Sequence, residues 1–221
     1  MRITIGIADD HISFLQSMSL LIESFAQMQI SLQAVDGKDL LQKLSMSGDL
    51  PQVCLIDVNM PVLSGPETVK QLTHEFPAIR TIAMSMEEDD ASLIKMLHNG
   101  CRGWWLKYQT PEELDSAIHE VLDHGYYNAD PLNVYHRRLA KDSPQPPTVT
   151  QGQPEGPGLQ LNEDELRLWQ LSASDLSPDL IRDRMGLSEE RLRSLQEQLY
   201  QKLHVRSRLG ACLEAIRRNI T

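Results

Sequence analysis

The sequence predicts an α/β fold, a doubly wound five-stranded parallel sheet, followed by a small all-α domain of four helices. Within the first 125 residues, five short apolar runs alternate with helical patterns, an order typical of α/β domains. The run at residues 53–56 is apolar throughout, which indicates a strand buried on both faces. From Leu161 onward, apolar residues recur only at helical spacing, which predicts the all-α part.

Each strand of the predicted sheet is followed by a helix. The expected strands are residues 3–8, 30–35, 53–56, 81–84 and 104–106. The last helix begins at Pro111 with two acids in its first turn and runs to about His124, as expected for a helix start. Pro61 ends the third strand soon after Asp57, because proline cannot donate a ladder hydrogen bond.

Three segments follow from these patterns. Residues 1–125 form the α/β domain, 126–158 a linker and 159–221 the helical domain. Residues 132–139 have the composition for a turn or two of helix, whereas residues 142–158 contain five prolines and three glycines and are expected to be extended or flexible. In the helical domain, helices are expected around Leu166, from Ser177 to Met185, after Ser188 and from about Ser207.

The charge, the apolar runs and the cysteine content indicate in which compartment the protein works. The net charge is −10; residues 1–125 hold 18 acids and 8 bases, whereas residues 159–221 hold 10 of each. No apolar run approaches the roughly 18 residues that span a bilayer, and the amino terminus does not resemble a signal peptide. Three widely spaced cysteines favour reduced thiols. We therefore expect a cytoplasmic protein.

Polar side chains follow four of the predicted strands. They are Asp9 and Asp10 after the first, Asp57 after the third, Ser85 after the fourth and Lys107 after the fifth. The carboxyl ends of parallel strands meet at one edge, where ligands bind. Carboxylates held close together favour a hard cation such as Mg²⁺. Asp57 could then act as a nucleophile toward a phosphoryl group, with Lys107 and Ser85 contacting its oxygens.

These residues resemble the receiver domain of two-component response regulators, which has a flavodoxin-like fold. The resemblance covers about residues 1–125 and implies that a sensor histidine kinase phosphorylates Asp57. It also implies that Asp9, Asp10, Asp57 and the backbone carbonyl of Asn59 hold Mg²⁺. Ser85, Lys107 and Trp104 then fall at the phosphoryl-binding and switch positions. Asn59 and Glu87 flank the path of the hydrolytic water and are expected to tune dephosphorylation, giving a short-lived phosphorylated form.

Two residues close in sequence to these site residues, His11 and Trp104, also have interpretations that need no functional role. His11 follows the acids, but a hard magnesium site prefers oxygen ligands, so we expect a surface or helix-start histidine. Trp104 also suits a packing role, and its switch role rests on the resemblance alone.

The helical domain resembles the NarL/LuxR family of helix-turn-helix output domains over about residues 159–218. The apolar pattern, including Leu192, Leu199 and Val205, carries this resemblance. It implies a recognition helix beginning near Ser188 that enters the major groove. The candidate DNA-contacting residues are Arg191, Arg193, Ser194, Gln198, Lys202, Arg206 and Arg208. Departures from the family are Glu197 at a position that is often basic, Gln196 where arginine is common, Arg191 in place of a small threonine and Leu195 in place of a polar or aromatic residue.

The leading hypothesis is a response regulator whose phosphorylation at Asp57 controls DNA binding, with a homodimer forming on phosphorylation. The alternative is that the helical domain acts by dimerisation or protein binding, since its charge is balanced. A magnesium-dependent phosphohydrolase fits less well, because such enzymes typically carry an acid at the position of Asn59. The protein is therefore expected not to be an enzyme beyond its own phosphorylation and dephosphorylation.

Overall fold

The computed structural model describes residues 2–87, 91–129, 159–174 and 176–220. The chain divides into two compact units, Met1–Tyr127 and Asn128–Thr221. The segment predicted for a turn of helix at residues 132–139 and the proline-rich segment 142–158 lie outside the described residues.

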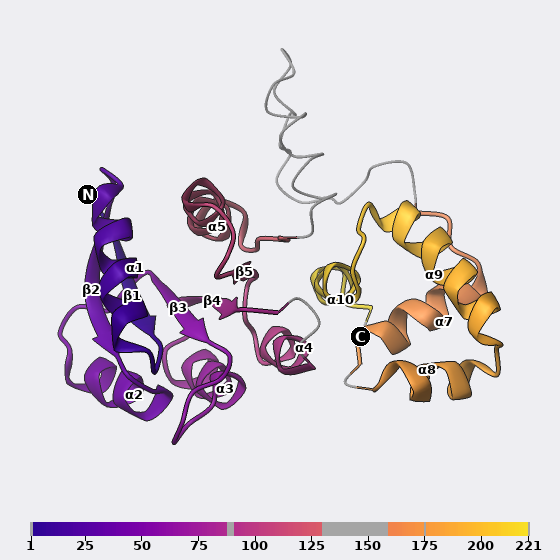
Figure 1. The fold of residues 1–221 in the computed structure, drawn as a ribbon, viewed down its shortest axis with the longest axis horizontal. Helices are drawn as coiled ribbons and strands as arrows, with labels where there is room; N and C mark the ends of the chain where they lie inside the picture. Colours follow the sequence, from indigo (N-terminus) through magenta and orange to yellow (C-terminus); the bar gives the residue numbers. More distant parts are fainter. Residues whose placement is uncertain (1, 88–90, 130–158, 175, 221) are drawn as a thin grey trace, which may run out of the picture. The chain divides into compact units, whose positions relative to one another are not determined.

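The first unit is a single parallel sheet with helices on both faces (Figure 1). Its strands are β1 (Ile3–Ala8), β2 (Met28–Ala34), β3 (Val53–Asp57), β4 (Arg80–Ser85) and β5 (Trp104–Leu106), in the order β2-β1-β3-β4-β5. Its helices are α1 (Ile12–Ser24), α2 (Gly37–Met46), α3 (Gly65–Glu75), α4 (Ala91–His98) and α5 (Pro111–His124). Figure 1 shows α1 and α5 on one face and α2, α3 and α4 on the other. The predicted doubly wound fold is confirmed.

Burial along the strands follows their place in the sheet. Every residue of the central strand β3 is buried, whereas in the edge strand β2 exposed residues alternate with partly buried ones between the two buried end residues. The register places Ala8 of β1 beside Ile56 of β3, so the residues that follow both strands emerge at the same edge. This alignment positions the polar residues considered below.

Side-chain caps fix the starts of the helices beside this edge. Before α3, the Ser64 hydroxyl donates to the Glu67 carboxylate at 2.7 Å, and the Ser64 backbone N–H donates to it at 3.2 Å. Before α5, the Thr110 hydroxyl accepts from the backbone N–H of Glu113, and Glu113 accepts in return from the Thr110 N–H. The cap of α5 is reciprocal, and both caps satisfy backbone N–H donors that helix geometry leaves unpaired.

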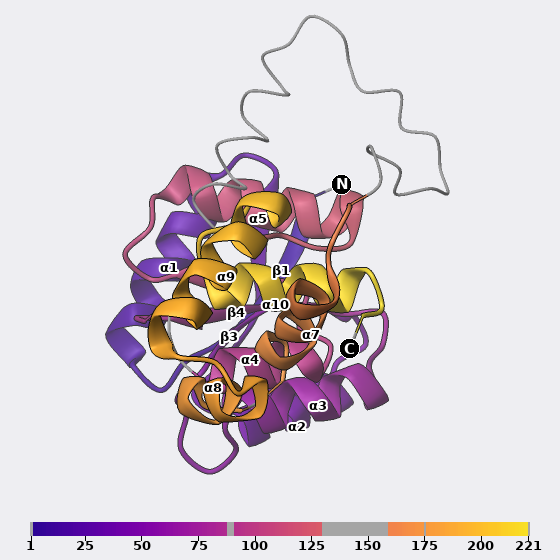
Figure 2. The same ribbon diagram turned by 90° about the vertical axis from the view of Figure 1, so that its right-hand side faces the viewer.

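The second unit contains the helices α7 (Glu163–Ser172), α8 (Pro178–Met185), α9 (Glu189–Leu203) and α10 (Arg208–Arg217) (Figure 2). Its core is built around Trp169, whose side chain is fully buried and whose indole N–H donates to the carbonyl of Ala211 at 2.8 Å. This bond ties α7 to α10 and satisfies the polar end of a large buried side chain. The predicted all-α character of this region is confirmed.

All three cysteines are buried free thiols. Burial raises the pKa of Cys54 to about 12. Burial likewise raises the pKa of Cys212 to about 12, against a smaller opposing effect of Arg208. Within the described part of the chain, no helix combines the length and apolar character needed to cross a membrane.

Candidate functional site

The centre of the site is a pair of buried carboxylates at the ends of adjacent strands. Asp9 directly follows β1 and is fully buried, and Asp57 is the last residue of β3 and is 5% exposed. Burying two carboxylates side by side is costly unless a cation or hydrogen-bond donors compensate their charge. The sheet register therefore places two buried carboxylates together, and a nearby positive charge would stabilise them.

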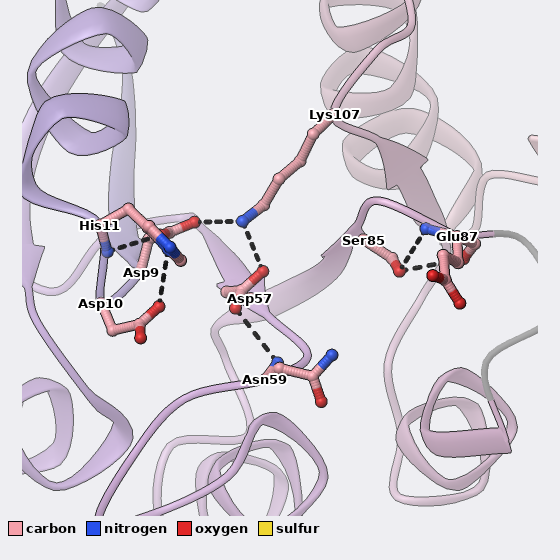
Figure 3. A network of polar contacts seen from close by, with 8 residues as sticks. All are labelled: Asp9, Asp10, His11, Asp57, Asn59, Ser85, Glu87 and Lys107. Carbon is pink, nitrogen blue, oxygen red and sulfur yellow. Dashed lines mark hydrogen bonds and ion pairs between the residues drawn. The ribbon is translucent and has the colours of Figure 1, made fainter.

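Lys107, which directly follows β5, partly compensates the charge of the two carboxylates (Figure 3). Its Nζ lies 2.6 Å from Asp9 Oδ2 and 2.6 Å from Asp57 Oδ1. The lysine side chain is only 8% exposed, so solvent screens these contacts poorly. Three residues far apart in the sequence thus form one buried charge cluster, as their positions at strand ends predict.

The pKa directions show that this compensation is incomplete. Burial raises the pKa of Asp57, and the charge of Asp9 adds to the rise; the opposing effects of Lys107 and the Asn59 N–H are smaller in sum. Burial lowers the pKa of Lys107, but its contacts with Asp57 and Asp9 outweigh this, so the pKa is raised. One ammonium group faces two carboxylates, and the cluster keeps an excess of negative charge.

Asp10 and His11 extend the cluster toward solvent. His11 Nδ1 lies 2.9 Å from Asp10 Oδ1 and 3.3 Å from Asp9 Oδ1, and together these side chains could offer ligand atoms to a metal ion. His11 immediately precedes α1, and its side chain is 70% exposed, as expected for a histidine at a helix start. The carboxylate oxygens and the residual negative charge suit Mg²⁺, which prefers hard oxygen ligands and retains water.

Asn59 and Ser85 have different relations to Asp57. The backbone N–H of Asn59 donates to Asp57 Oδ2 at 3.1 Å, so the loop after β3 folds back over the carboxylate. The Ser85 hydroxyl instead donates to the carbonyl of Glu87 at 2.9 Å and accepts from the Glu87 N–H at 3.1 Å. In Figure 3, Ser85 lies toward Glu87, apart from the contacts that join Lys107 to Asp57.

The aromatic residue expected at the switch position is part of the core. Trp104 lies in β5, is 1% exposed and pairs with Ala83 of β4. Its indole N–H has no hydrogen-bond acceptor among the residues that the structure describes. A buried donor without a partner costs about 1–3 kcal/mol. The packing interpretation agrees with this burial, and the switch role stays a prediction.

The candidate DNA-contacting residues lie on or just after α9 and differ in how firmly they are held. Arg191, Arg193 and Gln198 are exposed on the helix. Arg193 forms only a 3.6 Å ion pair with Glu189, in which both side chains are largely exposed, so this pair restrains it little. Ser194 is partly buried, and Arg206, beyond the helix, is exposed.

Two of the candidate bases have contacts inside the second unit. Lys202 Nζ lies 2.7 Å from the carboxylate of Glu165, which is 1% exposed. The Arg208 guanidinium donates to three carbonyls at the end of α7 and in the turn that follows, those of Ser172, Ser174 and Leu176, at 2.9, 2.7 and 2.6 Å. Both side chains therefore stabilise the fold, and phosphate contacts by them stay a prediction.

One contact at the site does not follow from the sequence pattern. Phe14, in the first turn of α1, places its ring 4.5 Å from Lys107 Nζ. Helical spacing makes Phe14 look like one more apolar residue beside Leu15 and Met18. Only the three-dimensional meeting of α1 with the end of β5 identifies it.

The chain is similar in sequence to several known proteins. Residues 5–119 match the family described as "Response regulator receiver domain". The chain is 23% identical to the transcriptional regulatory protein DegU of Brevibacillus brevis, covering 98% of this chain and 94% of that protein. It is 26% identical to the response regulator GacA of Pseudomonas aeruginosa, covering 97% and 96%.

Solved structures show the same fold. The isolated receiver domain of RcsB from Salmonella enterica, with a phosphomimetic, matches with a TM-score of 0.52 at 22% identity and covers 58% of this chain and 94% of that one. A structure of two RcsB dimers bound to two parallel DNAs matches with a TM-score of 0.54 at 19% identity, covering 96% of each chain.

Proposed function

Because this chain belongs to the response regulator receiver family, we propose that it is a transcriptional response regulator controlled by phosphorylation of Asp57. The observation that carries this proposal is the contact of Lys107 Nζ with both Asp9 and Asp57 at 2.6 Å. A nucleophilic carboxylate beside an ammonium group and further acids has the composition of a phosphoryl acceptor. The proposed setting is the cytoplasm, where a sensor histidine kinase is the phosphoryl donor.

The chemistry follows from the positions of the side chains. An Asp57 oxygen forms the new bond to phosphorus as the bond to the donor's imidazole nitrogen breaks, and that nitrogen retains the electron pair. Lys107 is placed to pair with the phosphoryl oxygens. Asp9, Asp10, Asp57 and the Asn59 carbonyl would hold Mg²⁺. A Mg²⁺ ion held there would neutralise negative charge on the phosphoryl group.

Ser85 must change partners for its proposed role. Its hydroxyl donates to the carbonyl of Glu87 and accepts from the Glu87 N–H, so donation to a phosphoryl oxygen requires the donated bond to break. A charge-assisted bond to a phosphoryl oxygen is stronger than a neutral one, which supplies a driving force for the exchange. We propose that this exchange, with repacking of Trp104, transmits phosphorylation to the output domain.

Intact-protein mass spectrometry tests the acceptor. Incubation of the full chain with acetyl phosphate and Mg²⁺ should add the mass of one phosphoryl group. The addition should be lost in Asp57→Asn and when EDTA removes the metal ion. The matched control is Asp49→Asn, an exposed aspartate in the same domain, which should behave as wild type. Unchanged wild-type mass with acetyl phosphate and with a phosphorylated kinase would contradict the proposal.

We further propose that the phosphorylated form is short-lived. The exposed Glu87 and the amide of Asn59 stand at the positions expected to orient a hydrolytic water. Loss of phosphate from the isolated chain is the measurement. Persistence over many hours, with Asn59→Ala and Glu87→Ala decaying at the wild-type rate, would count against it.

For the output we propose sequence-specific DNA binding by a phosphorylation-dependent dimer, through the exposed residues of α9. The relative DegU is a transcriptional regulatory protein by name, and one similar structure contains dimers on DNA. Genome-wide DNA capture with wild type and Asp57→Ala side by side tests this. Binding should depend on Asp57 and weaken steeply with added salt, because phosphate contacts release counterions.

The balanced charge of the helical unit favours a second candidate, an output that acts by protein contact. Failure of the phosphorylated dimer to capture DNA at low salt would favour it over DNA binding.

A further inference from the structure

The ammonium group of Lys107 contacts two carboxylates and one aromatic ring. Asp9 Oδ2 and Asp57 Oδ1 each lie 2.6 Å from Nζ. The third neighbour is the ring of Phe14, whose centroid lies 4.5 Å from Nζ. A lysine ammonium carries three N–H donors, and the face of an aromatic ring attracts a cation within about 6 Å of its centroid.

The geometry points to Phe14 as a positioning residue for phosphoryl transfer, in which its ring holds the Lys107 ammonium beside Asp57. This inference rests on the proposed function. It deepens that function by adding a residue that neither the strand-end pattern nor the receiver resemblance identifies.

The reason for an uncharged anchor lies in the competition for carboxylate oxygens. Asp9 and Asp57 bind Lys107 and are also the groups proposed to hold Mg²⁺. Oxygens that a metal ion shares attract the ammonium less strongly, because their negative charge is partly neutralised. The ring of Phe14 is not a metal ligand, so its attraction for Lys107 persists when both carboxylates are engaged.

The site also favours a ring interaction on physical grounds. The Lys107 side chain is 8% exposed, and Phe14 is partly buried, so little water competes for the ammonium. Cation–π interactions are worth about 0.5–1 kcal/mol at exposed sites and about 2 kcal/mol when desolvated. Losing the interaction should therefore slow phosphorylation by about 2- to 30-fold, since about 1.36 kcal/mol corresponds to a tenfold change in rate.

Phe14 also fills space in the first turn of α1, so the test must separate ring electrostatics from packing. Mono-, tri- and pentafluorophenylalanine at position 14 keep the ring while progressively weakening the negative potential of its face. In the full chain, the rate constant for phosphorylation by acetyl phosphate should fall stepwise along this series. Phe14→Tyr and Phe14→Trp should retain most of the rate, whereas Phe14→Leu should not.

The matched control is Phe25→Leu, at the C-cap of the same helix and likewise partly buried. It should lower the thermal midpoint without a comparable loss of phosphorylation rate. Equal rates along the fluorinated series, or equal rate losses in Phe14→Leu and Phe25→Leu, would overturn the inference.

A separate readout distinguishes failure of this inference from failure of the proposed function. Protons on the Lys107 side chain near the ring face should resonate upfield in the NMR spectrum because of the ring current. That shift should vanish in Phe14→Leu and survive in Phe25→Leu, whether or not the protein is phosphorylated. If the shift is present but Asp57 accepts no phosphoryl group, the proposed function fails and the positioning role falls with it. If Asp57 is phosphorylated and the shift is absent, only the positioning role fails.

Discussion

Val62, in the loop between β3 and α3, has a backbone conformation that its side chain disfavours. Its φ is +66°, and the N–H of Leu63 donates to the carbonyl of Pro61 at 2.7 Å across it. This bond closes a three-residue γ-turn. Positive φ is strained for a β-branched residue, and strain of this kind often occurs in loops at functional sites. The Val62 side chain is 74% exposed, so it gains little from burial in return.

Replacing Val62 by glycine should stabilise the first unit. Glycine adopts positive φ without steric cost, although it loses more entropy on folding. We expect a net gain of about 0.5–1 kcal/mol in the free energy of unfolding, measured by urea titration. The matched control Val35→Gly, at an exposed valine without positive φ, should instead destabilise. A loss of stability in Val62→Gly equal to that in Val35→Gly would show that the turn is not strained.

Gly65, at the start of α3, lies against the backbone of the proposed acceptor. A Cβ built there would come within 2.4 Å of the Asp57 carbonyl oxygen and 2.9 Å of Val58 Cα. Backbone atoms cannot move aside as a flexible side chain can. Gly65→Ala should therefore destabilise the unit by about 1–3 kcal/mol and slow phosphorylation by shifting Asp57. Gly48→Ala, where the same Cβ meets nothing within 4 Å, is the control and should be neutral. Wild-type stability and phosphorylation rate in Gly65→Ala would contradict this close approach.

At the scale of elements, a partly buried ion pair joins α7 to α9. Glu165 is 1% exposed, whereas Lys202 is 41% exposed. Burial raises the pKa of Glu165. Hydrogen bonds from Lys202 and the Asn162 N–H, together with the charge of the lysine, lower the pKa by more than burial raises it. The net pKa therefore lies below the ordinary glutamate value of 4.5, and the pair stabilises the fold of the second unit.

Breaking this pair should have a pH-dependent cost. Lys202→Met leaves a buried carboxylate unpaired and should lower stability at pH 7 by about 1–3 kcal/mol, less than for a fully buried pair because Lys202 is partly exposed. A depressed carboxylate pKa contributes stability above its unfolded value, and that contribution is lost as pH falls through the folded value. The difference between wild type and variant should therefore shrink below pH 4.5. Urea titrations from pH 7 to pH 3 measure it, and a constant difference would contradict this account. Arg182→Met, which removes exposed ion pairs on α8, should change stability by only a few tenths of a kcal/mol.

The elements differ in how much of them the sequence predicts. The bounds of β1 and β5 agree with the predicted residues 3–8 and 104–106. The strand β2 begins at Met28, two residues before the predicted start, because its pairing with Ile3 of β1 extends it. Such pairing joins residues far apart in the sequence, so local periodicity cannot reveal it.

The candidate site is predictable to the same extent. Strand ends bring Asp9, Asp57 and Lys107 together, because sheet topology alone decides their meeting. Two further features depend on tertiary geometry and have no sequence signal, namely the hydroxyl of Ser85 turned toward Glu87 and the ring of Phe14 beside the lysine.

At the scale of the whole molecule, charge is divided unequally between the two parts. The excess of acids lies in residues 1–125, and residues 159–221 are balanced. On α9, the exposed Glu197 lies one position before the candidate base reader Gln198. If α9 binds DNA as proposed, the negative charge of Glu197 would repel DNA phosphates, and removing that charge should strengthen binding.

Glu197→Gln should raise the affinity of the phosphorylated protein for captured DNA several-fold at low salt, as about 1 kcal/mol for one repulsive contact implies. Fluorescence anisotropy with a captured fragment measures the effect. Glu23→Gln, an exposed acid on α1, is the charge-matched control and should leave affinity unchanged. Equal affinities for Glu197→Gln and wild type would place Glu197 away from the DNA and favour the protein-contact output.

The burial of the three thiols has a practical consequence for following how each part opens. Cys54 and Cys101 lie in the first unit, and Cys212 lies in α10 of the second. A buried thiol with a raised pKa resists alkylation until its surroundings open. Pulses of iodoacetamide followed by peptide mapping should therefore give the alkylation rate of the cysteines in each unit separately, without any introduced label. If phosphorylation increases opening of only one unit, alkylation of the cysteines in that unit should become faster, and alkylation in the other unit should keep the rate of the unphosphorylated protein.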